Sequence, residues 1–187
     1  MSESAMTAKE TFGQPRSRTS TWHDPLATAA VAAGLSGREF AEAIAGGRLP
    51  PPPMASLLGI RVTGVGEGEV LMTCAADEAF YNPLGVVHGG LLCTLLDTAM
   101  GLALHTLLPP GAGFSTIEIK VNFLKPVRDD DGDLRARGRV TKRGSRVTFA
   151  EAEVRDPSGS IVGNATSSLL VFDPPPRAQT RQENHLE

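Results

Sequence analysis

The strongest constraint on the fold is an apolar segment of about twenty residues, from Val87 to Leu107, that contains a single carboxylate. The segment is too long for a β-strand, and it closes at the turn Pro109-Pro110-Gly111. Its length would suit a membrane span, but the charge at Asp97 and the helix-weakening Gly101 favour a helix buried in a folded domain. We therefore predict one long buried helix and no membrane span.

β-Prone runs lie on both sides of this helix, two before it and four after it. The glycine-rich stretch 64–68 joins the first two runs as a hairpin. Apolar residues alternate with polar ones in the later runs, and Ile117, Ile119, Val121 and Phe123 are predicted to share one face. The predicted strands are Leu57–Thr63, Glu69–Cys74, Phe114–Phe123, Asp133–Thr141, Arg146–Arg155 and Ser160–Phe172.

This alternation indicates a sheet with one buried face, and only the long helix is apolar enough to cover that face. The predicted fold class is therefore α+β: an antiparallel sheet of about six strands wrapped around one long central helix. Residues 51–173 form this domain. Short helices are expected at Pro25–Ala33 and Arg38–Ala45, in a helical extension over residues 25–50. The ends of the chain, residues 1–24 and 174–187, are predicted to be a flexible arm and a flexible tail.

Composition excludes several classes of partner. A net charge of -3 offers no general attraction to nucleic acid. The two cysteines lack the spacing of a zinc site, and the acidic stretch 129–133 lacks the spacing of a calcium loop, so we predict no metal. The Ser- and Thr-rich first two dozen residues contain no apolar secretory signal, which favours a cytoplasmic location.

Paired glycines stand at the start of the long helix. Gly89 and Gly90 allow a ligand to approach the backbone closely, and the unpaired amides at a helix N-terminus favour negative charge. They could form an oxyanion hole, or they could only let the helix and the sheet pack closely.

Asp97 is the second candidate, because a charged side chain among leucines costs stability unless it has partners or a task. One interpretation is a carboxylate that only accepts a hydrogen bond from a nearby hydroxyl, such as Thr94 or Thr98. The other interpretation is a catalytic carboxylate.

The spacing Asn82-x-x-Gly85-x-x-His88-Gly89-Gly90, with Asp97 nine residues after His88, resembles the phenylacetic-acid-degradation (PaaI-like) type of hotdog-fold acyl-CoA thioesterase. The resemblance continues through residues 114–126 and covers roughly residues 57–172. It implies a hotdog fold that hydrolyses an acyl-CoA or aroyl-CoA thioester to a free acid and CoA, without a cofactor.

The resemblance also implies roles for residues. Asp97 acts as general base for water or as nucleophile, and the Gly89 amide stabilises the oxyanion. Asn82 and His88 position the carbonyl or the attacking water, although His88 could instead be structural. Ser115, together with Thr116, assists near the carboxylate. Gly90 and Thr116 are assigned to substrate binding.

A basic turn between two predicted strands supplies candidate phosphate contacts. Arg143 and Arg146 could bind the phosphates of CoA. Alternatively, the turn is solvated and balanced by acids such as Glu151 and Glu153.

An oligomer follows from helix geometry. Gly90 and Asp97 are about 10 Å apart along the helix axis, so one thioester contacts both most simply when they come from two subunits. We predict at least a dimer, and a homotetramer by resemblance. The N-terminal helices either cap the acyl pocket or extend the dimer surface.

Two other functions stay open. An enoyl-CoA hydratase or dehydratase of the same fold would pair His88 with a carboxylate. In a non-catalytic acyl-CoA-binding module, Asp97 would be only a structural hydrogen-bonding residue of the helix. The acyl group is left open.

Overall fold

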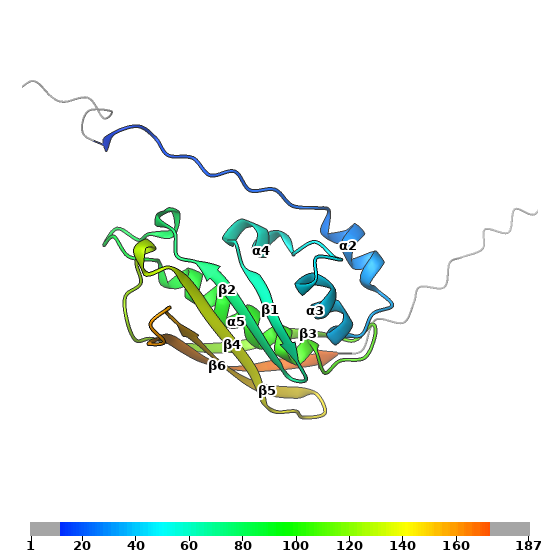
Figure 1. Cartoon of the computed structure of the whole chain (residues 1–187). Helices are drawn as coiled ribbons and strands as arrows, with labels where there is room; N and C mark the ends of the chain where they lie inside the picture. Colours follow the sequence, from blue (N-terminus) through cyan, green and yellow to red (C-terminus); the bar gives the residue numbers. More distant parts are fainter. Residues whose placement is uncertain (1–11, 173–187) are drawn as a thin grey trace, which may run out of the picture.

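The computed structural model describes residues 12–172 (Figure 1). The flexible arm that the sequence predicts over residues 1–24 therefore lies partly outside the described residues, and the tail predicted over residues 174–187 lies wholly outside them. Residues 13–24 form neither helix nor strand. Within this stretch, Arg18 lies over the ring of Phe80, 4.7 Å from its centroid.

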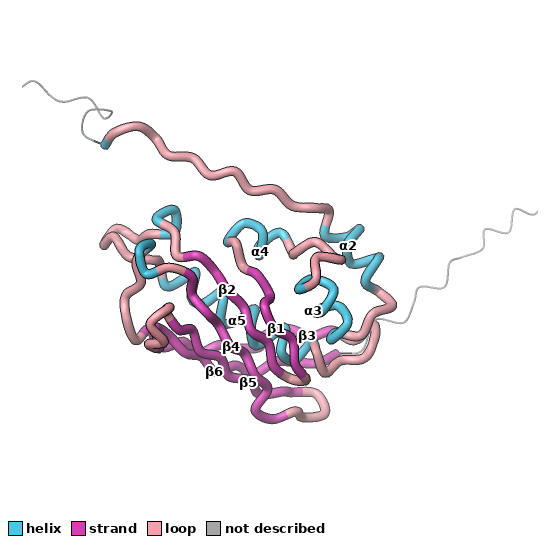
Figure 2. Tube along the Cα trace, viewed as in Figure 1, coloured by secondary structure: helices cyan, strands magenta, loops and turns pink. Residues whose placement is uncertain are grey.

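Six antiparallel strands form one sheet, in the order β1-β2-β4-β5-β6-β3. The long helix α5, Gly89–His105, packs against one face of this curved sheet (Figures 1 and 2). The predicted α+β architecture is thus confirmed. The strands are β1 (Arg61–Gly66), β2 (Glu69–Ala75), β3 (Gly113–Phe123), β4 (Asp133–Lys142), β5 (Val147–Arg155) and β6 (Ile161–Phe172), and 3-10 turns occupy Glu78–Phe80 and Asp129–Asp131.

No helix within residues 12–172 combines the length and the hydropathy needed to cross a membrane.

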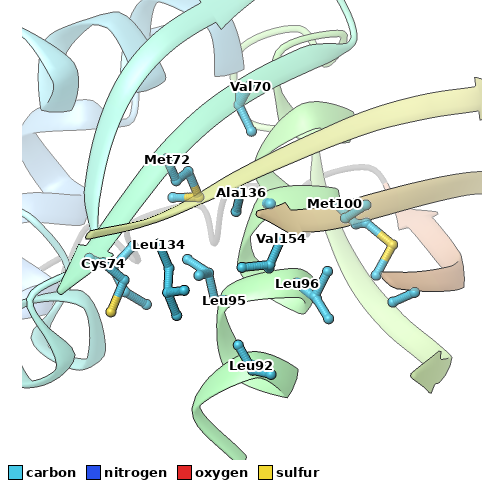
Figure 3. Packing of buried hydrophobic residues seen from close by; sticks show 14 of the residues in the cluster. Val70, Met72, Cys74, Leu92, Leu95, Leu96, Met100, Leu134, Ala136 and Val154 are labelled. Atoms are coloured by element: carbon cyan, nitrogen blue, oxygen red, sulfur yellow. The ribbon is translucent and has the colours of Figure 1, made fainter. Parts of the chain in front are cut away.

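The core lies between α5 and the sheet. Apolar side chains from the helix and from alternate strand positions meet in one cluster. Figure 3 shows Leu92, Leu95, Leu96 and Met100 of the helix facing Val70, Met72, Cys74, Leu134, Ala136 and Val154 of the strands.

Gly138 of β4 lets the helix approach the sheet. A Cβ at this position would lie 2.3 Å from the carbonyl oxygen of Ala99 in α5. Backbone of the helix therefore rests directly on backbone of the strand, which no residue with a side chain would permit.

Between residue 13 and the sheet lie three short helices: α2 (Pro25–Ala32), α3 (Gly37–Ala45) and α4 (Pro53–Leu58). The predicted strand start at Leu57 is wrong, because Leu57 lies in α4 and β1 begins at Arg61. Proline fixes a helical φ at the first helical position, here Pro53, and Gly59 ends α4 with a left-handed φ of 70°.

Helix α3 is docked against the end of α5. A capping box between Ser36 and Glu39 fixes its start. The amide of Gly37 donates to the carbonyl of Leu108 at 3.0 Å. A Cβ on Gly37 would fall 1.8 Å from the His105 oxygen, so the first turn of α3 touches the last turn of α5.

A β-bulge interrupts β3. Its register against β6 shifts between Thr116 and Glu118. Ile117 is the extra residue, and it is 56% exposed. The prediction that Ile117 shares the inner face with Ile119 is therefore wrong, because a bulge adds a residue and reverses the alternation before it.

A buried carboxylate ties the β5–β6 turn to the segment after β3. Asp156 is only 4% exposed. It accepts hydrogen bonds from Lys125 Nζ at 2.6 Å and from the Ser160 amide at 3.0 Å. The Lys125 ammonium, helped by the Ser158 hydroxyl, lowers the pKa of Asp156 from 3.8 to about 2.

Asp156→Asn is expected to lower the melting temperature near neutral pH. A depressed carboxyl pKa adds stability that is complete above 3.8 and is lost as the pH falls toward about 2. The melting-temperature difference from wild type should therefore shrink over that window, as followed by circular dichroism. Glu42→Gln, which removes an exposed pair with Arg38, serves as control and should change little. A difference that stays constant with pH would contradict this account.

Candidate active site

Asp97 lies on α5 and is half-buried. Its Oδ1 accepts a hydrogen bond of 2.8 Å from the hydroxyl of Thr116 on β3. The nearby helix hydroxyls do not serve it: Thr94 donates to the Gly90 carbonyl and Thr98 to the Thr94 carbonyl. A residue of the sheet, Thr116, thus holds the carboxylate in place through Oδ1. The other oxygen, Oδ2, accepts no hydrogen bond from residues 12–172.

A largely apolar pocket of about 330 Å³ has Asp97 and Thr116 in its wall. The other polar side chains in the wall are Thr98 and His105. The apolar lining comes from α3, α4, β1, β2, α5 and β3. Concave apolar sites with a few placed polar groups are the usual form of small-ligand sites.

Three rings pack at tilted angles along one side of this pocket. The His105 imidazole lies between Phe40 of α3, with ring centroids 5.2 Å apart, and Phe114 of β3, at 5.8 Å. Burial lowers the pKa of His105. The neutral imidazole therefore dominates near pH 7, and this wall carries no charge there.

The loop before α5 is shaped by its own hydrogen bonds. The Asn82 side chain accepts from the amide of Leu84 at 2.8 Å, while the Asn82 amide donates to the Val86 carbonyl at 2.8 Å. The Val87 amide donates to the Val127 carbonyl, which joins the loop to the segment after β3. Asn82 thus fixes the loop that leads to the glycines.

His88 is the N-cap of α5. Its Nδ1 accepts from the Gly90 amide at 2.8 Å, so that amide is already engaged. The Gly89 amide, by contrast, has no hydrogen-bond partner within residues 12–172. A Cβ on Gly89 would meet the ring of Phe123 at 2.9 Å, so the glycine permits this contact.

His88→Ala is expected to lower the free energy of unfolding by about 1 kcal/mol, because the Gly90 amide loses its cap. His88→Asn keeps a side-chain acceptor and should restore most of that loss in denaturant titrations. If both variants are as stable as wild type, the cap has no energetic role.

Within one chain, the predicted residues divide into two groups. The first, which we call the carboxylate half-site, is Asp97 with Thr116. The second, the amide half-site, is the loop and helix start at residues 82–90. Ser115 is exposed on β3, and the contact with the carboxylate is made by Thr116 instead.

The basic turn lies apart from both half-sites. Arg143 and Arg146 are exposed and form no ion pair within the part of the chain that the structure describes. The acids expected to balance them are paired elsewhere, since Glu151 binds Arg139 and Glu153 binds Arg155.

Sequence reasoning did not find three pocket residues, Phe40, Ile44 and His105. Phe40 and Ile44 occupy one face of α3, which is a visible signal of burial but not of what they cover. Residues 12–172 hold no group of three or more His, Cys, Asp or Glu side chains placed to bind a metal.

Comparison with known proteins agrees with this geometry. The thioesterase superfamily profile matches residues 84–162. A Halobacterium salinarum protein provisionally named an esterase is 38% identical over 118 residues, which cover 60% of this chain and 76% of the relative. Human acyl-coenzyme A thioesterase 13 is 24% identical over 68% of this chain and 79% of its own length.

A solved structure extends the match to the fold. It is a phenylacetic-acid-degradation-related protein from Ralstonia eutropha, provisionally described as a thioesterase. The two chains are 31% identical, with a TM-score of 0.65 over 70% of this chain and 98% of that one. The fold and these matches thus place the chain among hotdog-fold hydrolases of the thioesterase type. The chain belongs to the thioesterase superfamily, and its similarity to phenylacetic-acid-degradation proteins is confirmed.

Proposed function

We propose that this protein hydrolyses an acyl-CoA or aroyl-CoA thioester to a carboxylic acid and free CoA. The observation that carries the proposal is a carboxylate, Asp97, held by Thr116 in the wall of an apolar pocket. Membership of the thioesterase superfamily supports thioester hydrolysis. The name of the human relative, an acyl-coenzyme A thioesterase, supports CoA as the leaving group.

Asp97 supplies the base or the nucleophile. Thr116 fixes Oδ1, which leaves Oδ2 to take a proton from water or to attack the carbonyl carbon itself. In the water route, Asp97 takes a proton as the water oxygen bonds to the carbonyl carbon, the C–S bond then breaks, and the proton passes from Asp97 to the CoA sulfur, which leaves as the thiol. In the nucleophile route, attack by Asp97 breaks the C–S bond and forms a mixed anhydride, which water then hydrolyses to the free acid and the Asp97 carboxylate.

The Gly89 amide stabilises the carbonyl oxygen as it becomes negative. Among the described residues no group accepts from this amide, and it lies at the start of α5, where backbone N–H groups and the helix dipole favour an anion. His88 and Asn82 hold the loop that aims this amide. Their proposed role is positioning.

A dimer brings the two half-sites together. β3 is an edge strand of the described sheet, and Gly89 packs beside its Phe123, whereas Asp97 binds its Thr116. Antiparallel pairing of two β3 edges, centred between residues 119 and 120, would set Thr116 opposite Phe123 of the partner subunit. The Gly89 amide of one protomer then serves the Asp97 carboxylate of the other.

The basic turn, the oligomeric state and the location complete the proposal. Arg143 and Arg146, which have no carboxylate partner within residues 12–172, are suited to bind the CoA phosphates. A homotetramer and a cytoplasmic location are expected as well, and light scattering and cell fractionation test them.

Hydrolysis is favoured over hydration of an enoyl-CoA. In a hydratase, His88 would pair with a carboxylate, but within residues 12–172 no carboxylate hydrogen-bonds to His88, whose Nδ1 accepts from the Gly90 amide. A binding module without catalysis is the remaining alternative.

The test is release of free CoA thiol from a panel of aryl and aliphatic acyl-CoAs, beside hydration of an enoyl-CoA. Thiol release that depends on enzyme concentration supports the proposal. Hydration without thiol release would support the dehydratase, and binding without turnover would support the binding module. Either result overturns the proposal.

A further inference from the structure

Part of the pocket lining comes from residues that precede the matched profile. The superfamily profile covers residues 84–162, but Phe40 and Ile44 of α3 and Met54 of α4 line the same pocket as Asp97. The N-terminal helices lie beside β1 at the sheet edge, as Figure 1 shows. This wall therefore comes from residues that precede the matched profile.

The wall is held rigidly at one end of α5. Gly37 donates to Leu108 and touches the His105 carbonyl, so α3 cannot shift along α5 without breaking these contacts. The Phe40 ring packs against the His105 ring at an interplanar angle of 55°, and the His105 ring packs against Phe114 at 52°. Asp97 lies two turns before His105 on the same helix. The pocket thus runs from the carboxylate to a wall of aromatic rings.

We propose that α3 limits the size of the acyl group, with Phe40 and Ile44 as the residues that determine specificity. This inference rests on the proposed thioesterase function. A cavity of about 150 Å³ holds one benzene molecule, so the 330 Å³ of this pocket holds roughly a dozen acyl carbons at similar density. The pocket accordingly favours thioesters of single-ring or medium-chain acids over those of long-chain fatty acids.

The experiment compares thiol release from saturated acyl-CoAs, from butanoyl-CoA to hexadecanoyl-CoA, by wild type, Phe40→Ala and Ile44→Ala. Wild-type kcat/KM should fall steeply beyond dodecanoyl-CoA. Each alanine variant should raise kcat/KM for hexadecanoyl-CoA relative to octanoyl-CoA by about tenfold or more, the usual scale for hydrophobic pocket discrimination. Ile44→Phe should change the preference the other way, toward shorter chains.

Phe149→Ala is the matched control, because Phe149 is exposed on the outer face of β5 and lies outside the pocket. It should leave the chain-length profile unchanged. Thermal unfolding establishes that each variant is folded, and Ile44→Phe tests the proposal even if Phe40→Ala does not fold.

Two results would overturn the inference, and they are distinguishable. If wild type hydrolyses acyl-CoAs but the folded α3 variants keep its chain-length profile, α3 is not the limiting wall and the proposed function stands. If wild type releases no thiol from any acyl-CoA, the proposed function fails and this inference fails with it.

Discussion

Asp97→Asn is expected to lower kcat/KM for CoA release at least about a hundredfold, the usual scale for removing a positioned acid or base. Asparagine has nearly the same shape as aspartate and its amide oxygen can still accept from Thr116, so the fold should be kept. It can neither take a proton from water nor attack as a carboxylate. Steady-state thiol release, with thermal unfolding of the same preparation, measures both effects.

Asp133→Asn is a suitable control, because Asp133 is an exposed carboxylate paired with Arg61 at the sheet edge. It should retain wild-type kcat/KM. Equal activity of Asp97→Asn and wild type would show that Asp97 has only a structural role in the helix. Thr116→Val, which keeps the carboxylate but removes its hydrogen bond, should give a smaller loss than Asp97→Asn.

Gly138→Ala is expected to have the largest effect on stability. The added methyl would lie 2.3 Å from the carbonyl oxygen of Ala99, and helix backbone cannot swing away as a side chain can. Overpacking of this kind should lower the free energy of unfolding by about 3 kcal/mol. Urea titration followed by circular dichroism measures the change.

Gly66→Ala in β1 is the matched strand variant. A Cβ there would make only ordinary contacts, the nearest at 3.6 Å, so stability should stay within about 1 kcal/mol of wild type. If Gly138→Ala is as stable as Gly66→Ala, the close backbone contact between β4 at Gly138 and α5 at Ala99 is not tight enough to exclude a methyl group.

The sheet and its helix could be predicted because their patterns are local. The apolar run ending at Leu107 is too long for a strand, and β4 alternates cleanly between buried and exposed positions. The boundary at α4 was missed because Leu57 and Leu58 suit a strand as well as a helix. Their conformation is set by Pro53 and Gly59 at the two ends.

The carboxylate half-site was only partly predictable. Asp97 is conspicuous as a lone charge in an apolar helix, but its partner depends on the bulge in β3. With strict alternation from Ile119, Ser115 would face inward and Thr116 outward. The extra residue Ile117 reverses these positions, and a bulge leaves little trace in one sequence.

The sequence left open whether the N-terminal helices cap the acyl pocket, but the residues of the pocket wall could not be predicted, because they come from segments that are distant in sequence. Phe40 meets His105 only after the sheet has curved and α3 has docked on α5. A pattern on one helix shows that a face is buried without showing against what.

Because α3 docks on the last turn of α5, the residues proposed to react and the residues proposed to select the acyl group come from different parts of the chain. The groups proposed for bond breaking all lie from Asn82 onward, whereas the α3 and α4 walls of the pocket come from residues 36–58. Exchange of that short segment between homologous genes would then transfer the preference for an acyl group from one protein to the other. New substrates could be acquired by recombination upstream, with the reacting residues left untouched.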